Sequence, residues 1–363
     1  MTIDDSLAMP PETMEYSVNG AYQPEQEIQP GWQVFNLADA YIEREPTRYI
    51  VDGILAEASL NIMYAPPAAM KSMLLADLAC CVAAGKPWLE GPSGGVKVMR
   101  RPVLWIDMDN GERRTHERFN ALGKGHNLTP DAPLNYVSMP VDPLLHLTDL
   151  EAVEHLIYTI RDYQAGLVVM DNLGLIAGDV DENSAKMAEV MSYLRTTAER
   201  TGAAIIVIHH QRKGGTMAGG RLGDSLRGHS SIEAALDLAL HVVREPGESM
   251  LTISSTKTRG VDVPVLRAKF NYQHRPGTKD LALAWFEEWA PTRGENPIRD
   301  AILEVLGKLG ESTKGRLADE VYEHLGQSTG INKIRNWIGE MATVTGEIVE
   351  ETGENNAKLL RLK

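Results

Sequence analysis

The chain has 363 residues, of which 43% are hydrophobic and 24% are charged, a composition that excludes disordered, fibrous and collagen-like proteins. Its formal net charge of −14 at pH 7 excludes a protein that coats nucleic acid by bulk attraction, so any such contact needs a local basic cluster. The length fits one domain of about 230 residues plus a smaller satellite.

The cysteines and the apolar runs indicate the cellular compartment in which the protein functions. Cys80 and Cys81 are the two cysteines, and their adjacency in an apolar run favours two small buried side chains over a disulfide or a metal site. The first residues have neither the basic start nor the apolar core of a signal peptide, and no apolar run reaches the roughly 18 residues that span a bilayer. We therefore expect a cytoplasmic protein with no membrane contact.

From the N-terminus onward, residues 1–30 are rich in Pro, Glu and Asp and predict a flexible acidic tail. Residues 31–290 alternate strand-like apolar runs with helical patterns, which predicts an α/β domain. Near-continuous Val, Ile and Leu runs indicate strands buried on both faces of a mostly parallel sheet sandwiched by helices. The predicted strands are 59–64, 102–107, 166–171, 203–209, 236–243 and 250–255, and the clearest helices are 71–84 and 183–201.

The last segment, 295–363, has helical patterns at 297–309, 317–325 and 331–341, followed by a hairpin pattern from residue 347. Three helices and a hairpin resemble a winged-helix domain. With 9 basic and 12 acidic residues this segment does not separate DNA binding from docking to a protein. The expected recognition helix offers Asn332, Lys333, Arg335 and Asn336, whereas Glu350, Glu351 and Glu354 crowd the expected wing.

The strongest motif is a strand, a tight loop and then Lys71 and Ser72 at the start of a helix. In a phosphate-binding loop, backbone N–H groups cradle the phosphates, the lysine reaches the β and γ oxygens, and the serine joins the Mg²⁺ shell. Ala65 and Met70 replace both glycines of the G-x-x-x-x-G-K-[ST] pattern, so an ordinary strand-to-helix turn remains an alternative. The nucleotide loop would comprise Ala65, Pro66, Pro67, Ala68, Ala69, Met70, Lys71, Ser72 and Met73.

Acidic residues end two other predicted strands. Asp171 follows an apolar run and, with Ser72, is expected to hold Mg²⁺. Asp109 and Glu112 follow the strand at 102–107, where a solvated loop acid is the alternative interpretation.

Together these elements, over residues 45–275, resemble the RecA-like P-loop ATPases. The resemblance implies a RecA-like fold that binds ATP and Mg²⁺ between subunits. It also implies that an acid after the second strand orients the attacking water. That acid matches Asp109, one methylene shorter than the family's glutamate, with Glu112 as the alternative.

His209 and His210 end a strand and precede a glycine-rich basic loop, which resembles the RepA-like branch of hexameric replicative helicases. The resemblance implies that His210 contacts the γ-phosphate, although a structural histidine is a rival. A metal site is disfavoured because no other Cys or His shares a ligand spacing with the pair. The loop residues Arg212, Lys213 and Arg221 would contact single-stranded DNA through its backbone, because no aromatic residue there offers base stacking. A solvated surface loop is the alternative.

A further strand ends in Lys257-Thr258-Arg259-Gly260. This segment resembles the one that projects cations into the neighbouring subunit's site in ring ATPases. The resemblance implies that Arg259, supported by Lys257, acts in trans, with Arg227 as the alternative finger.

The expected function is that of a homo-hexameric, ring-forming, ATP-dependent DNA helicase or translocase in bacterial, plasmid or phage replication. One rival is a non-unwinding ATPase switch, such as a regulatory protein or recombination mediator with slow hydrolysis. The other is a structural interaction protein with an inactive nucleotide site. The winged helix would either bind DNA or recruit a replication or recombination protein.

Overall fold

The computed structural model describes residues 34–139, 146–178, 180–181, 184, 186–211, 230–244, 247–289, 296–343, 347–352 and 358–363. It divides into two compact units, Met1–Pro46 and Thr47–Lys363. In the first unit a short helix, α1 (Leu37–Tyr41), begins after Asn36, whose side chain accepts hydrogen bonds from the backbone N–H groups of Ala38 and Asp39. Asp39 completes a capping box with Asn36.

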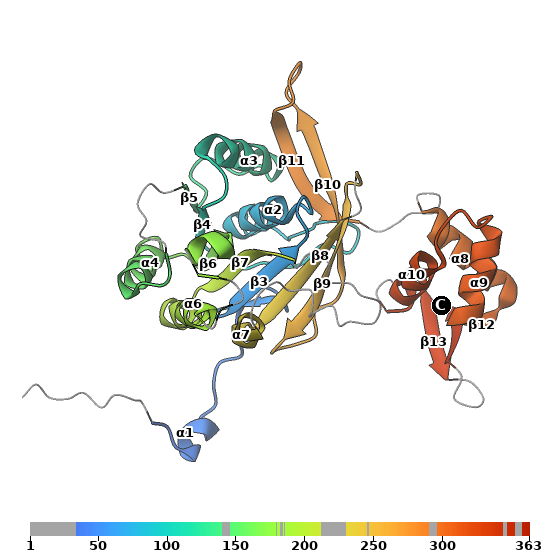
Figure 1. Cartoon of the computed structure of the whole chain (residues 1–363), viewed down its shortest axis with the longest axis horizontal. Helices are drawn as coiled ribbons and strands as arrows, with labels where there is room; N and C mark the ends of the chain where they lie inside the picture. The colour runs from blue at the N-terminus through green and yellow to red at the C-terminus, as the bar shows by residue number, and fades with distance from the viewer. Residues whose placement is uncertain are drawn as a thin grey trace, which may run out of the picture. The chain divides into compact units, whose positions relative to one another are not determined.

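A nine-stranded sheet forms the centre of the second unit, in the order β11-β10-β9-β8-β3-β7-β6-β4-β5 (Figure 1). Strands β8 to β5 in this order are parallel, and β9, β10 and β11 extend the sheet as an antiparallel meander. The strands are β3 (Leu60–Ala65), β4 (Val103–Asp107), β5 (Leu134–Ser138), β6 (Leu167–Asp171), β7 (Ala204–His210), β8 (Leu238–Arg244), β9 (Met250–Thr258), β10 (Leu266–His274) and β11 (Leu281–Glu288). A separate small hairpin pairs β1 (Tyr49–Val51) with β2 (Leu55–Ala56).

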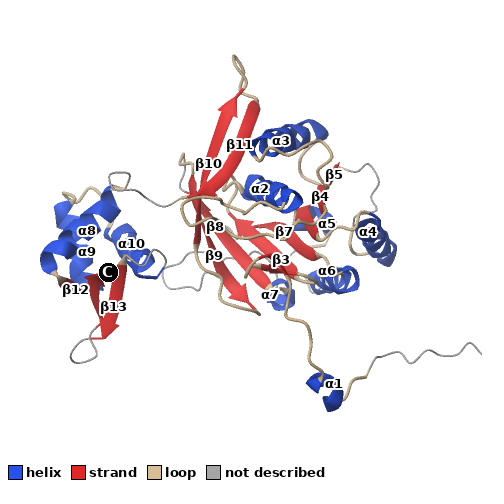
Figure 2. Ribbon diagram, turned by 180° about the vertical axis from the view of Figure 1, so that it is seen from behind, coloured by secondary structure: helices blue, strands red, loops and turns tan. Residues whose placement is uncertain are grey.

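Successive residues of the parallel strands are buried in opposite cores. In β3, Ile62 and Tyr64 belong to one core, whereas Met63 and Ala65 belong to the other. Helices cover both faces of the sheet (Figure 2). Helices α2 (Lys71–Ala84) and α3 (Glu112–Gly125) pack into one core, and α4 (Leu150–Asp162), α5 (Leu173–Ile176), α6 (Met187–Thr201) and α7 (Ser230–Ala235) pack into the other. The predicted α/β sandwich with a mostly parallel sheet is confirmed.

The sequence patterns missed some elements. Strand β5 lies at the sheet edge and is only half-buried, so its residues do not form an apolar run. In β10 and β11 the burial is also partial, which again weakens the apolar signal. Both α2 and α6 end at a left-handed glycine, Gly85 and Gly202, as the sequence predicts.

The C-terminal segment has its own hydrophobic core, which includes Ile302, Leu317 and Ile338. The predicted helices and hairpin are present, and a short strand, β12, adds a third strand by pairing with β14. The elements are α8 (Pro297–Leu309), β12 (Glu311–Thr313), α9 (Lys314–His324), α10 (Ile331–Thr343), β13 (Ile348–Thr352) and β14 (Lys358–Leu362). Within the described part of the chain, no helix combines the length and apolar character needed to cross a membrane.

The contact between α3 and β11 depends on a glycine. A Cβ atom added to Gly125 would lie 1.9 Å from the backbone oxygen of Ala284, whereas one added to Gly123 in the same helix would meet nothing within 4 Å. We expect Gly125→Ala to lower the free energy of unfolding by about 1–3 kcal/mol, because helix and strand must separate. Gly123→Ala, the matched control, should leave it unchanged or raise it by about 0.5–1 kcal/mol. Urea denaturation measures both, and equal effects would contradict this close approach.

Candidate nucleotide-binding site

The strand register brings several of the predicted site residues together at the carboxyl ends of the parallel strands. Ala65 at the end of β3 pairs with His210 of β7. Asp171 at the end of β6 pairs with Ile208 of β7 on one side and with Asp107 of β4 on the other. Because these strands are parallel, their carboxyl ends meet there, where ligands bind in open α/β sheets.

The loop between β3 and α2 holds its shape without glycine. Ala68 and Met70 both have φ of 63°, in the left-handed region that favours glycine. Met70 precedes α2, and no side chain caps the N-terminus of that helix. Free N–H groups at a helix N-terminus form an anion-binding site, so the loop retains the chief requirement for phosphate binding.

Lys71 folds back over this loop. Its Nζ donates hydrogen bonds to the backbone oxygens of Ala65 at 3.1 Å and Pro66 at 3.2 Å, and its side chain is mostly buried. Burial lowers the pKa of Lys71, and the negative charges of Asp171 and Asp109 act in the opposite direction. The ammonium group thus contacts the phosphate loop, and the charges of both acids act on it.

A cation that sequence reasoning missed supports the loop from β8. Arg244 donates a hydrogen bond from Nη1 to the backbone oxygen of Ala68 at 3.0 Å. Nothing in the local sequence marks this residue, since it lies 176 positions away from Ala68.

Asp171 and Ser72 lie together, as predicted for a pair that holds Mg²⁺. Burial raises the pKa of Asp171 to about 6, and a hydrogen bond from Ser72 lowers it in part. Its Oδ2 atom is buried and accepts no hydrogen bond from the described residues. A buried carboxylate with an open lone pair beside a hydroxyl is a suitable donor set for a hard divalent cation.

Asp107, which sequence reasoning did not select, organises the neighbouring loop. It is fully buried, and its carboxylate accepts hydrogen bonds from the backbone N–H and Nδ2 of Asn110 and from the hydroxyl of Thr115. Arg118 lies between two acids, with Nη1 at 3.3 Å from Asp107 and 3.9 Å from Asp171. The spacing 107, 110, 115 and 118 could have indicated this network, because a strand-end acid often caps the following turn and helix.

The two candidates for the water-orienting acid differ in place. Asp109 is exposed at the site mouth, and its charge acts on Lys71 and Asp171. Glu112 is the first residue of α3, its side chain is 80% exposed, and it lies 3.9 Å from His116. The geometry therefore favours Asp109 over Glu112 as the acid that would orient the attacking water.

The histidine pair divides into one buried and one partly exposed member. His209 is completely buried, which suits the structural interpretation, whereas His210 is partly exposed at the end of β7. The adjacent Gln211 donates its backbone N–H to Ala65 at 3.1 Å and places Oε1 3.1 Å from Nε2 of His241, which links β7 and β8 to the phosphate loop.

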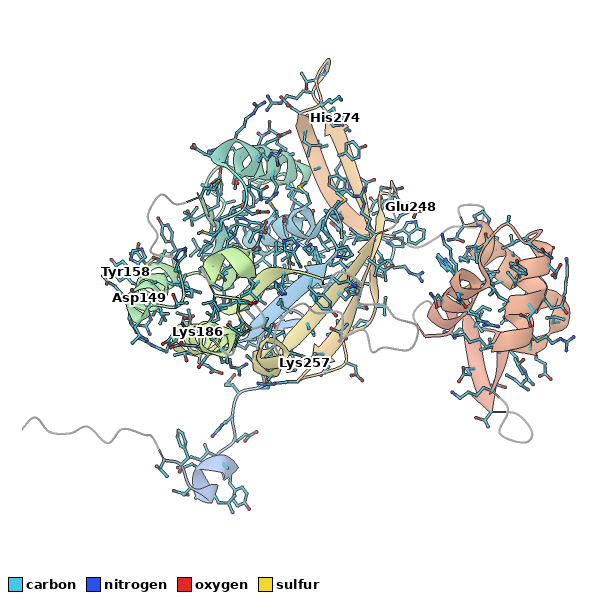
Figure 3. The ribbon with its side chains drawn as sticks, in the orientation of Figure 1. Asp149, Tyr158, Lys186, Glu248, Lys257 and His274 are labelled. Carbon is cyan, nitrogen blue, oxygen red and sulfur yellow. The ribbon has the colours of Figure 1, made fainter. Side chains whose placement is uncertain are left out.

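Lys257 and Arg259 lie near the amino ends of the parallel strands, away from the carboxyl ends where the phosphate loop lies. Lys257 lies beside α7 (Figure 3) and donates to the backbone oxygen of Glu233 in that helix. Arg259 donates to the backbone oxygen of Ala234 and pairs with Asp237 at 3.8 Å. Asp237 accepts a hydrogen bond from the N–H of Leu60, the first residue of β3, whereas the phosphate loop follows the last. The length of β3 thus places Arg259 roughly 16 Å from its own loop. Lys257 lies nearer along the strands, because its partner Ala239 in β8 pairs with Ile62 in the middle of β3. Arg212, Lys213, Arg221 and Arg227 lie outside the described residues.

The sequence profile of a family described as an AAA domain (AAA_25) matches residues 22–216, which is more than half of the chain. The chain belongs to this family. The structure is also similar to a crystal structure of the RadB recombinase, with a TM-score of 0.42 and 13% sequence identity, covering 59% of this chain and 88% of that chain. Family membership and site geometry agree on a P-loop ATPase domain.

The residues present fit ATP and Mg²⁺. Phosphates would meet the uncapped start of α2 and the ammonium of Lys71, and Ser72 with Asp171 would hold the cation. The bound cation would supply charge neutralisation at the phosphates. Lys71 would then exchange its contacts with the loop oxygens for contacts with phosphate.

The left-handed conformation of Met70 leads to a test of the phosphate loop. A non-glycine residue in this region costs about 1 kcal/mol or more, so Met70→Gly should favour the binding conformation and tighten ATP binding up to about fivefold. Ala69→Gly is the control, because Ala69 is not among the residues with positive φ. Titration with a fluorescent ATP analogue measures both, and equal gains would show that flexibility, not strain, limits binding.

The positions of Asp109 and Glu112 lead to a test of the hydrolytic step. Asp109→Asn should lower turnover by about 10² or more while ATP affinity changes little, because it removes a carboxylate and no phosphate contact. Glu112→Gln should leave turnover within about twofold, since that side chain is exposed and beside His116. Steady-state hydrolysis and equilibrium ATP binding, measured on both variants, check this. A larger loss of turnover in Glu112→Gln would move the role to that residue.

Proposed function

We propose that this protein is an ATP-dependent, ring-forming DNA helicase or translocase of the RepA-like type. The observation that carries the proposal is the placement of two cations, Lys257 and Arg259, at the sheet edge opposite their own phosphate loop. In a head-to-tail assembly, that edge of one subunit would face the phosphate loop of the next. Nucleotide sites would then be completed only between subunits.

Each of the acids and cations described above would have its own role in ATP hydrolysis at the interface between two subunits. Asp109 would orient the attacking water, His210 would contact the γ-phosphate, and Ser72 with Asp171 would hold Mg²⁺. Arg259 of a neighbouring copy would stabilise the charge that builds up on the transferred phosphoryl group. Arg118, already near Asp107 and Asp171, would hold the acids in place.

Single-stranded DNA would be contacted by Arg212, Lys213 and Arg221, in the glycine-rich segment that follows β7. This assignment rests on sequence: the segment carries clustered cations in a chain with a net charge of −14. Backbone phosphate contact without reading of bases would suit a translocase.

A winged-helix role for the C-terminal segment has two forms. Asn332, Lys333, Arg335 and Asn336 are exposed on α10, which suits a recognition helix. On the hairpin, however, Glu350 pairs with Lys358 and Glu351 with Arg361. The cations of the hairpin are thereby engaged, which favours docking to a replication or recombination protein through this surface.

The rival function is an ATPase switch that binds nucleotide, hydrolyses slowly and controls assembly on DNA. It is favoured by the left-handed Ala68 and Met70, which add strain to the phosphate loop. Steady-state hydrolysis with and without single-stranded DNA, together with mass measurement in ATP, separates the two. Hydrolysis stimulated by DNA in a ring supports the motor, and ATP-dependent assembly without stimulated turnover supports the switch.

Arg259 and the phosphate loop with Lys71 lie at opposite ends of the strands. We therefore expect subunits that lack one of these groups to complement subunits that lack the other. Arg259→Ala should leave ATP binding near normal and lower hydrolysis by roughly 10³ or more, the range known for arginine fingers. Lys71→Ala should abolish nucleotide binding. Mixed rings of the two variants should regain activity, because the intact loop of one meets the intact Arg259 of the other. Mixed rings, verified by mass, that stay inactive would contradict the trans assignment, as would full activity in monomers.

A further inference from the structure

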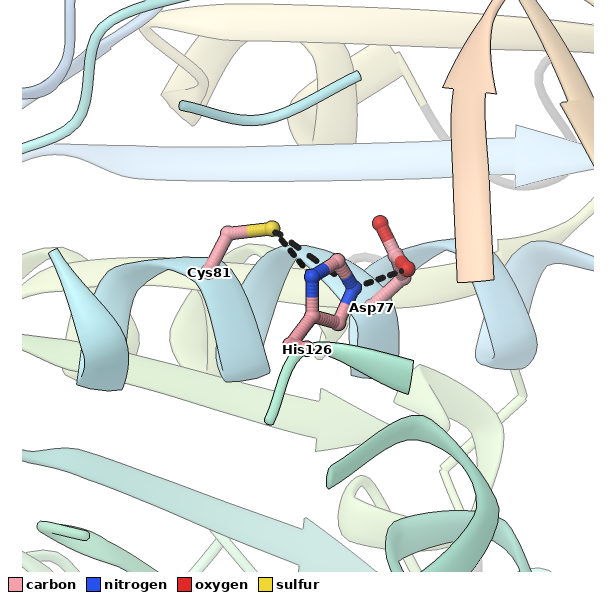
Figure 4. Close-up of side chains that lie close together, drawn as sticks. All are labelled: Asp77, Cys81 and His126. Carbon is pink, nitrogen blue, oxygen red and sulfur yellow. Dashed lines mark hydrogen bonds and ion pairs between the residues drawn. The ribbon is translucent and has the colours of Figure 1, made fainter. Parts of the chain in front are cut away.

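A second cluster of reactive side chains lies in the middle of α2, apart from the phosphate loop at its start (Figure 4). Asp77 and Cys81 are four residues apart and so share one face of the helix. His126, which directly follows α3, points its ring between them. The ligand atoms of the three lie within 4.8 Å of one another.

The distances fit a shared centre. Nε2 of His126 is 2.6 Å from Oδ1 of Asp77, and Sγ of Cys81 is 3.7 Å and 3.8 Å from the two ring nitrogens. Two ligand atoms bonded at about 2.0–2.3 Å in tetrahedral geometry lie roughly 3.3–3.5 Å apart, which fits the sulfur–nitrogen distances. The oxygen–nitrogen pair has hydrogen-bond length instead and must lengthen by roughly 0.7 Å to admit a metal ion. A small rotation of the Asp77 carboxyl would open that pair.

Charge and burial make the cluster unusual. Asp77 and Cys81 are completely buried, and the side chain of Trp88 is a further polar neighbour of the Asp77 carboxylate. Oδ1 also accepts the N–H of Phe286 at 2.9 Å. Burial raises the pKa of both Asp77 and Cys81, so neither charge is stable there alone. A divalent cation would balance one carboxylate and one thiolate and leave no net charge in the core.

The cluster is open to solvent on the His126 side, where a fourth metal ligand could enter. His126 is 12% exposed and lines a cavity of about 210 Å³ together with Lys86 and Glu90. Water or the Glu90 carboxylate could complete four ligands from this side. Lys86 donates a hydrogen bond to the backbone oxygen of His126, and its positive charge disfavours a bound cation. The negative charge of Glu90 acts in the opposite direction.

We propose that Asp77, Cys81 and His126 bind a divalent transition metal, with Zn²⁺ the best match, in a structural site that fastens α2 to the end of α3. One oxygen, one nitrogen and one sulfur ligand suit Zn²⁺ better than Mg²⁺ or Ca²⁺, which prefer oxygen. Binding releases the Cys81 thiol proton to solvent and displaces the proton shared by His126 and Asp77. A nucleophilic role for Cys81 is excluded because the thiol is buried and its pKa is raised.

The test uses the full chain, free of added histidines, treated with a chelator and titrated with Co²⁺ in excess Mg²⁺, which occupies the nucleotide site. A thiolate-to-cobalt charge-transfer band that saturates at one equivalent is expected, together with a rise in Tm on adding Zn²⁺. The band reports bonding to sulfur alone, so metal at Asp171 does not contribute. ATP binding is measured in a separate titration of the same protein. The cobalt result therefore does not depend on the proposed motor function.

Cys80→Ala is the matched control, because Cys80 is also buried, adjoins Cys81 and lies outside the cluster. It should keep the band, whereas Cys81→Ala and His126→Gln should lose it. Absence of the band in the wild-type chain would overturn the proposal and leave a buried Asp77–His126 pair. Loss of the band in Cys80→Ala with retention in Cys81→Ala would overturn it as well. Should Cys81→Ala fail to fold, the wild-type and Cys80→Ala spectra decide.

Discussion

Burial of both faces of the parallel sheet dictates where this protein can bind a ligand. Side chains of β3, β6 and β7 alternate between two cores, so neither face of these strands is open to a ligand. Polar groups that must meet a ligand can leave the apolar cores only at the strand ends. The phosphate loop, Asp171 and His210 therefore gather at one edge, although they are far apart along the chain.

Asp107 shows how a buried charge can organise such an edge. A carboxylate without contact to water is stable only when donors surround it, and Asn110, Thr115 and Arg118 supply them. These bonds fix the turn after β4 and the first turns of α3. As a result, Asp109 is held at the mouth of the site, and Arg118 is brought within 3.9 Å of Asp171.

Helix α2 connects two sites of different chemistry. Its N-terminus presents N–H groups and Lys71 to the phosphate loop, whereas its middle carries Asp77 and Cys81 towards His126. Its interior face must be apolar to pack on the sheet, so the polar groups of its middle need partners from α3 and β11. Helix α2 therefore carries Lys71 at its start and the buried contacts of Asp77 roughly one and a half turns further on.

Local sequence signals were enough to predict the α/β class, the strands β3, β4, β6 and β7, the bounds of α2 and α8, and the loop with Lys71 and Ser72. They suffice there because apolar runs, glycine caps and a lysine-serine helix start depend on near neighbours in the chain. The strand order, the partly buried strands β5, β10 and β11, and the roles of Asp107, Arg118 and Arg244 emerged only from the folded chain. Folding also set Lys257 and Arg259 away from their own phosphate loop and brought His126 to Cys81, because such contacts join residues whose separation leaves no periodic trace in the sequence.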